Sequence, residues 1–111
     1  MIETIFQDYL IEQLAGVPIL LEEPENPPDR YVVLQKTGSA HENQIHTATF
    51  AVRSYGPSLY AAAALNCDVI QAALGMRPNN GVFCAELNSD YEYTNIQTKQ
   101  YRYQAVLVIY Y

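Results

Sequence analysis

The chain has 111 residues, half of them hydrophobic, and we expect one domain over 1–111 with a sizeable buried core. Its formal net charge is -6, from 12 acidic residues against 6 lysines and arginines. Nucleic-acid-binding proteins gain most of their affinity by neutralising phosphates with basic side chains, so this balance argues against that class.

The two cysteines, Cys67 and Cys84, lie in unrelated apolar contexts without the short spacing of a metal site. We predict that both are buried free thiols in a reducing cytoplasm. No stretch approaches the ~18 apolar residues of a membrane span, and MIETIFQD carries acids where a signal peptide has basic residues. The sequence predicts a protein kept in a cytoplasm or released with a particle assembled there.

The first predicted element is an amphipathic helix over residues 2–14, because Phe6 and Leu10 recur at helical spacing before Gly16. A short strand in VPILLEE follows it. The proline-rich segment PENPPDR can continue neither element and predicts an exposed loop.

Two strands come next. Residues 30–38, RYVVLQKTG, are β-branched and apolar on both faces, which predicts an interior strand that ends in a turn over SAHENQ. In residues 45–55, Ala48, Phe50 and Val52 alternate with polar residues, which predicts a strand with one face on a core.

The central alanine-rich segment, GPSLYAAAALNCDVIQAALGM, is the clearest helix, begun by Pro57 or Ser58 and ended by Gly75. Its narrow polar stripe predicts that it lies deep against a sheet, with Leu59 and Leu74 among its apolar positions.

Two strands complete the chain. The residues of VFCAELNSDYEY alternate between two faces, and we expect one face on the core and the other in water. The core set is Phe83, Ala85, Leu87, Tyr91 and Tyr93. Residues 101–111 form the last strand. The element order predicts an α+β fold, a mostly antiparallel sheet of four to five strands packed against an N-terminal and a central helix.

The sequence offers little chemistry. His41, Glu42 and His46 could be drawn as a metal site, but without a third ligand of matching geometry we interpret the histidines as solvated. Cys67 lies on an apolar helix beside an acid, which does not favour a nucleophile. Neither a phosphate loop nor a G-x-S-x-G turn is present. We therefore predict a protein that is not an enzyme, with no cofactor and no metal.

Ten tyrosines and no tryptophan mark this chain. Tyrosines 91, 93, 101 and 103 could stack on bases, but few basic residues frame them, so cross-strand packing is the simpler account. Tyrosine also suits surfaces that are wet in one assembly state and buried in another.

Four segments resemble the tail terminator proteins of long-tailed bacteriophages and prophages, which complete the tail and join it to the head. The segments are PPDRYVVLQKTG, ATFAVRSYGPSLYAAAALNCDVIQAAL, LNSDYEYT and TKQYRYQAVLVIYY. The likeness extends over residues 1–111 in length and element order. Asn95 stands where relatives more often carry an acid in the turn before the last strand, and both side chains favour turns.

The resemblance implies a structural role. Such proteins form a ring, commonly a hexamer, that caps the tail tube and offers a docking surface to the head. The implied partners are further copies of the chain, the tail tube protein and the head–tail connector, with no membrane. DNA passes through such a ring, and a negative charge would not retain it. The implied location is the virion, assembled in the bacterial cytoplasm.

Two alternatives stay open: a head-completion or minor capsid protein of the same junction, and a small ligand-binding domain that uses the 41–46 loop. A ring of one small subunit needs a head-to-tail interface with two different surfaces. Our candidate interface residues lie in the 22–29 connector, the 38–44 loop, two strands and the C-terminus: Glu23, Glu25, His41, Glu42, Arg53, Tyr101, Arg102, Tyr103, Tyr110 and Tyr111.

The last strand, YRYQAVLVIYY, divides into two faces at a period of two. The face with Ala105, Leu107 and Ile109 belongs on the helices. The other face begins with Arg102, for which we expect a carboxylate partner, Glu86, Glu92 or an acid of the next subunit. Because this second face turns apolar towards its end, we expect partial cover there, either by the amino-terminal segment of the same chain or by a neighbouring subunit. Trimming Tyr110–Tyr111 should then weaken assembly more than folding.

Overall fold

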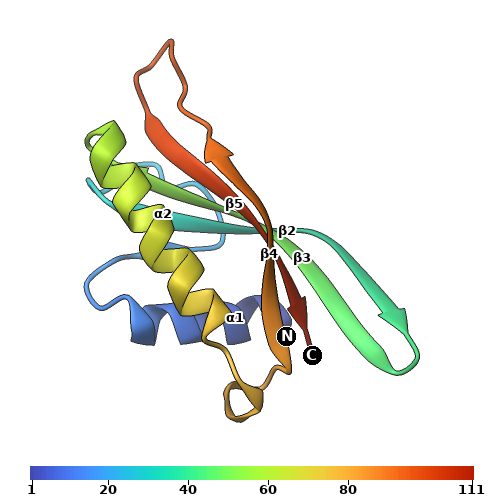
Figure 1. The fold of residues 1–111 in the computed structure, drawn as a ribbon. Coiled ribbons are helices and arrows are strands. Elements are labelled where there is room, and N and C mark those ends of the chain that lie inside the picture. Colours follow the sequence, from blue (N-terminus) through green and yellow to red (C-terminus); the bar gives the residue numbers. More distant parts are fainter.

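The computed structural model describes residues 1–111, with only the backbone described at Asn79. The elements are α1 (Ile2–Gln13), β1 (Ile19–Leu20), β2 (Tyr31–Glu42), β3 (Ile45–Gly56), α2 (Leu59–Leu74), η1 (Pro78–Asn80), β4 (Cys84–Glu92) and β5 (Tyr101–Tyr110). The strands form one sheet in the order β1-β2-β3-β5-β4, in which only the β1–β2 pair is parallel (Figure 1). The predicted α+β fold, with a mostly antiparallel sheet and two helices, is confirmed.

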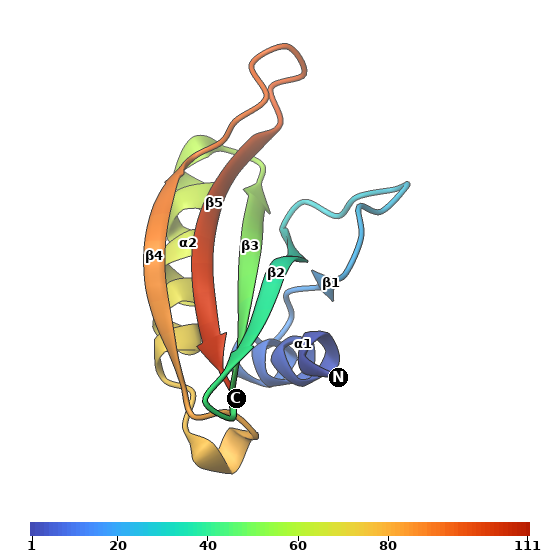
Figure 2. The ribbon, with the colours of Figure 1, turned by 90° about the vertical axis from the view of Figure 1, so that its right-hand side faces the viewer.

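Both helices pack on one face of the sheet, which we call the covered face. The Phe6 ring of α1 meets the Phe50 ring of β3 edge-on, with centroids 5.0 Å apart. Leu65 of α2 and Leu107 of β5 belong to the same buried cluster. We call the opposite side the open face; Figure 2 looks onto it, with α2 behind the strands. Burial on the covered face is the main source of stability.

Local chemistry sets where α2 begins. The Ser58 side chain accepts a hydrogen bond from the Ala61 N–H at 3.1 Å, which caps the first turn. Gly56 lies so close to the helix that a Cβ there would stand 2.7 Å from the Ala62 nitrogen. A side chain at this position would push α2 away from β3.

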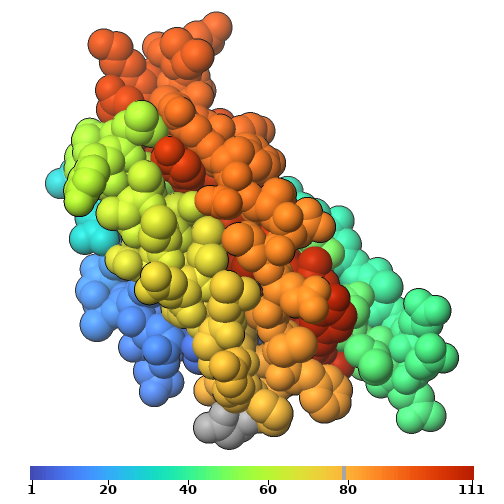
Figure 3. Space-filling view, in the orientation of Figure 1, coloured from blue at the N-terminus to red at the C-terminus, as the bar shows by residue number. Residues whose placement is uncertain are grey.

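The expected deep burial of α2 is wrong. Its buried residues are Ala62, Leu65, Asn66, Val69 and Ala73. Leu59 and Leu74 are 39% and 40% exposed. Because α2 is the outermost layer of the fold, only one stripe of the helix meets the sheet. Apolar side chains therefore remain on its outer surface. Figure 3 shows α2, in yellow-green to yellow, on the surface of the molecule.

The β2–β3 hairpin is longer than expected. The predicted 38–44 loop is wrong: β2 continues to Glu42, and the turn consists of Asn43 and Gln44, whose φ angles of 51° and 64° suit a type I′ turn. Residues 35–46 are all exposed. We call them the arm, because they extend away from the body of the molecule (Figure 1). The arm contributes to the overall extents of 44 × 25 × 24 Å.

The expected core face of β4 is wrong at its start and beyond its middle. Phe83, predicted to lie on the core, comes just before the strand and is 61% exposed. The register with β5 shifts between Leu87 and Ser89, so Asn88 forms a β-bulge. Beyond the bulge the odd-numbered residues change face, and Tyr91 and Tyr93 leave the core, 42% and 44% exposed. In the sequence, the polar residue Ser89 interrupts the series of residues expected on the core face, and this interruption is the signal of the bulge.

We expect Phe50→Ala to lower the free energy of unfolding by about 3–5 kcal/mol, because it leaves a cavity beside Phe6. Phe83→Ala is the control, since Phe83 is 61% exposed, and it should change this free energy by less than about 0.5 kcal/mol. Urea unfolding measures both. Equal losses in the two variants would contradict the assigned core.

Candidate assembly surfaces

The centre of the open face is half-buried, apart from the buried Ala51. It is formed by side chains of the two central strands: Thr47, Thr49 and Ala51 of β3, and Val106, Val108 and Tyr110 of β5. In β5 this is the predicted second face that turns apolar, and its residues are half-buried. The amino-terminal segment, one of the two covers expected for it, does not lie over this face. Its cover within the chain comes from neighbouring strands, since both helices lie on the covered face.

The 22–29 connector is fastened to one end of the open face. There the Tyr31 and Tyr55 rings stack 4.3 Å apart, and a small buried cluster forms with Val33. The Tyr55 hydroxyl donates a hydrogen bond to the Glu23 carboxylate. Arg53 Nε lies 3.7 Å from Glu23 Oε1. The structure thus brings together the predicted residues Glu23 and Arg53 through a tyrosine pair that the sequence did not single out.

Burial changes the acid–base behaviour of these tyrosines. Burial raises the pKa of Tyr31 to about 12, helped by the nearby Glu23 carboxylate. Burial also raises the pKa of Tyr55, and its hydrogen bond to Glu23 acts in the same direction. Both hydroxyls therefore stay protonated in the folded protein at pH values where exposed tyrosines ionise.

Arg102 has a different partner from the one expected. Its Nε donates to the Tyr93 carbonyl at 2.6 Å, and its guanidinium carbon lies 4.5 Å from the centroid of the Tyr93 ring. Its Nη1 reaches the Tyr55 hydroxyl at 3.4 Å. Glu86 is hydrogen-bonded to Tyr110 instead, and Glu92 lies in register with Tyr103 on the other face. The bulge in β4 explains why Arg102 has a different partner, because it puts Tyr93 on the open face, where the sequence pattern had put an acidic side chain.

The C-terminal tyrosines have separate contacts. The Tyr110 hydroxyl donates to Glu86 Oε2 at 3.1 Å, and this bond raises the pKa of Tyr110. Tyr111 packs against the covered-face cluster and exchanges two backbone hydrogen bonds with His46, of 2.8 and 3.1 Å. Deletion of Tyr111 should therefore lower the free energy of unfolding, in addition to removing any contact that Tyr111 makes in an assembly. Tyr101 and Tyr103 are half-buried.

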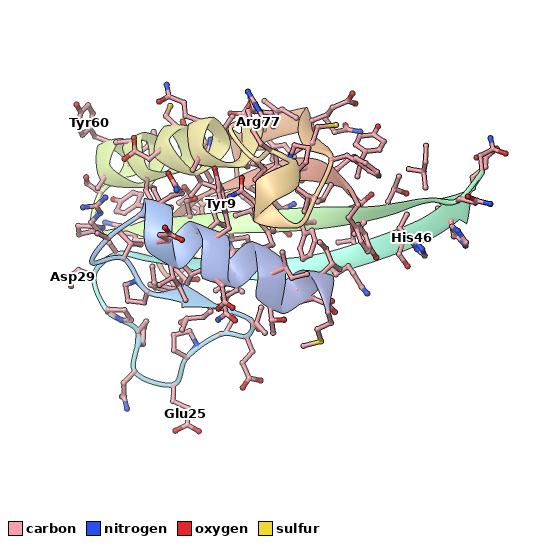
Figure 4. The ribbon with its side chains drawn as sticks, turned by 90° about the horizontal axis from the view of Figure 1, so that it is seen from below. Tyr9, Glu25, Asp29, His46, Tyr60 and Arg77 are labelled. Atoms are coloured by element: carbon pink, nitrogen blue, oxygen red, sulfur yellow. The ribbon has the colours of Figure 1, made fainter. Side chains whose placement is uncertain are left out.

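The arm carries the two histidines. His41 and His46 lie directly opposite each other in the β2–β3 register, and their rings stack 4.0 Å apart. The predicted loop position of His41 is therefore wrong, because β2 extends past it. Figure 4 shows His46 out on the arm, and Glu25 on the connector, away from the body. Among the described side chains, no group of three or more His, Cys, Asp or Glu could hold a metal ion.

Both cysteines are free and exposed, so the prediction that they are buried is wrong. Cys67 lies on the outer stripe of α2, and Cys84 opens β4 at the edge of the sheet. Apolar sequence neighbours indicated burial, but each cysteine occupies the outward position of its element.

Comparisons with known proteins leave the chain without an assigned family: no protein-family model matches it, and the search of curated proteins found no match. In the part of the chain that the structure describes, neither helix has the length and apolar character needed to cross a bilayer.

The buried Tyr31 makes stability depend on pH at the alkaline end. Its pKa rises from 10.0 to about 12 on folding, so the unfolded chain releases the proton first and stability falls as the pH rises from about 10 to about 12. In Tyr31→Phe this fall should be shallower. Denaturant midpoints measured across this pH range, with the exposed-site variant Tyr60→Phe as control, test it. Equal slopes in all three proteins would contradict the burial assigned to Tyr31.

Proposed function

We propose that this protein is a bacteriophage or prophage tail terminator, which assembles into a ring, caps the tail tube and provides the surface that joins tail to head. The proposal begins from the sequence resemblance. The protein would have a structural role, partner with copies of itself, the tail tube protein and the head–tail connector, and reside at the head–tail junction of the virion.

The observation that carries the proposal is the arm. Residues 35–46 are all exposed, although β2 is paired with β3 along this stretch. Because the pairing of β3 with β5 ends at Thr47 and Tyr111 reaches only His46, the tip of the arm is a two-stranded hairpin, and an isolated hairpin of this kind is marginally stable in water. A partner that covers the arm is therefore expected, and a subunit of a ring supplies one.

The open face supports the same proposal. Its centre, where Val106 and Val108 lie beside Ala51, has no helix over it. The arm and the open face are two dissimilar surfaces on one chain. Dissimilar surfaces permit head-to-tail assembly, which closes into a ring when the rotation between subunits allows it.

Charge is consistent with passage of DNA. The connector exposes Glu22, Glu23, Glu25 and Asp29, and the whole chain has a formal net charge of -6. A ring of this charge repels the phosphate backbone, so DNA would pass through without being held.

We expect the protein to form rings, alone or at the ends of tail tubes isolated from particles that lack it. Negative-stain microscopy of the protein with and without tubes tests this, because a ring at a tube end stops further growth of the tube. Tubes from complete particles are the control and should bind no additional protein. A protein that forms no ring and leaves the tube ends bare would contradict the proposal, and binding to isolated heads alone would indicate the head side of the junction.

A further inference from the structure

Two edges of the sheet lack a strand partner within the described chain. β4 is the last strand on one side and pairs only with β5. On the other side β1 pairs with β2 only at Val32 and Val33, so the rest of β2, which belongs to the arm, has β3 as its sole neighbour. The free part of β2 and the nine-residue β4 are of similar length. Unpaired edges of this kind are templates for strand addition.

The strand directions make the two edges compatible. β2 and β3 are antiparallel, β3 and β5 are antiparallel, and β5 and β4 are antiparallel. β4 therefore runs antiparallel to β2. If a second copy continues the sheet with the same face outward, its β2 lies antiparallel to β4 of the first copy, and the alternation of directions is unbroken.

The backbone donors at each edge point outward. The Tyr93 N–H donates to the Arg102 carbonyl in β5, so the N–H groups of Asp90 and Glu92 face away from β5. In the arm, Glu42 and Ile45 close the two-residue turn, so the N–H groups of Ser39 and His41 face away from β3. Both edges thus offer the alternating donors that an antiparallel ladder requires.

The irregularities of the two edges also match. Each edge has one bulge, at Thr37 and at Asn88, which prevents pairing with an arbitrary strand. In an antiparallel pair the arm beyond its bulge lies opposite the start of β4, and the two bulges meet. The arm has one lysine, Lys36, and one acid, Glu42, whereas β4 has three acids and no basic residue, so Lys36 is the one cation that this joint brings to the acidic strand.

We propose that copies of this chain join edge to edge, with the arm strand β2 of one copy added antiparallel to β4 of the next. The joint is head-to-tail, because it uses different edges of the two copies. It deepens the proposed function and rests on it, since it supplies the contact that builds the ring.

Cys84 offers a direct test, because it is exposed on the open-face side at the start of β4. On the arm, Ala40 and Glu42 share that side, whereas Ser39 and His41 lie on the covered-face side. In a Cys67→Ser background, single cysteines are introduced at the four arm positions, and the concentrated full-length protein is treated with a mild oxidant. Non-reducing gels then report the covalent species.

Ala40→Cys and Glu42→Cys should give ladders of dimers, trimers and larger species, because each chain then carries both halves of the joint. Ser39→Cys and His41→Cys should give little cross-linking, because their side chains point to the other side of the sheet. Loss of the ladder in Cys84→Ser would confirm the partner cysteine. Tyr60→Cys, on the outer surface of α2, is a matched exposed control.

Three results would overturn the joint: no ladder at any of the four positions, equal ladders at all four, or dimers alone, which indicate a two-fold contact. Failure of the joint and failure of the proposed function are distinguishable. Rings on tube ends without the alternating cross-links would reject the edge pairing only, whereas alternating ladders with bare tube ends would reject the tail role only.

Discussion

Two helices can cover only one face of this five-stranded sheet, and that limit shapes the rest of the molecule. The covered face packs around Phe6, Phe50 and Leu107. The open face has only the connector at one end, held by Glu23 and the Tyr31–Tyr55 stack. The chain of 111 residues buries its core on one face of the sheet and leaves the other face, two strand edges and the arm without a helix over them.

The arm and the unpaired sheet edges are features that a single copy of the chain does not explain. A hairpin with exposed residues on both faces gains little from its own body, and a sheet edge with outward N–H groups invites addition of a strand. Both features are ordinary in a subunit whose partner completes the sheet. The tail terminator proposal and the edge-to-edge joint connect them, because the same antiparallel pairing covers the arm and joins the subunits.

The elements and fold class could be predicted from the sequence because periodicity and local chemistry report them, as the alternation around Phe50 and the cap at Ser58 show. Register could not be predicted. One bulge at Asn88 turns two tyrosines to the open face and gives Arg102 a carbonyl and a ring in place of a carboxylate. Of the candidate interface, Arg53, Glu23 and Arg102 do converge, but around Tyr55, which looks like an ordinary strand residue in the sequence.

The most direct measurement of the central claim is residue-resolved amide hydrogen exchange in the dilute and the assembled protein. If the unpaired edges join the copies, the outward amides of Ser39, His41, Asp90 and Glu92 exchange rapidly when dilute and become strongly protected on assembly. The inward amide of Tyr91, already bonded to β5, should change little. Protection that appears elsewhere, with these four amides still exchanging rapidly in the assembly, would contradict the account.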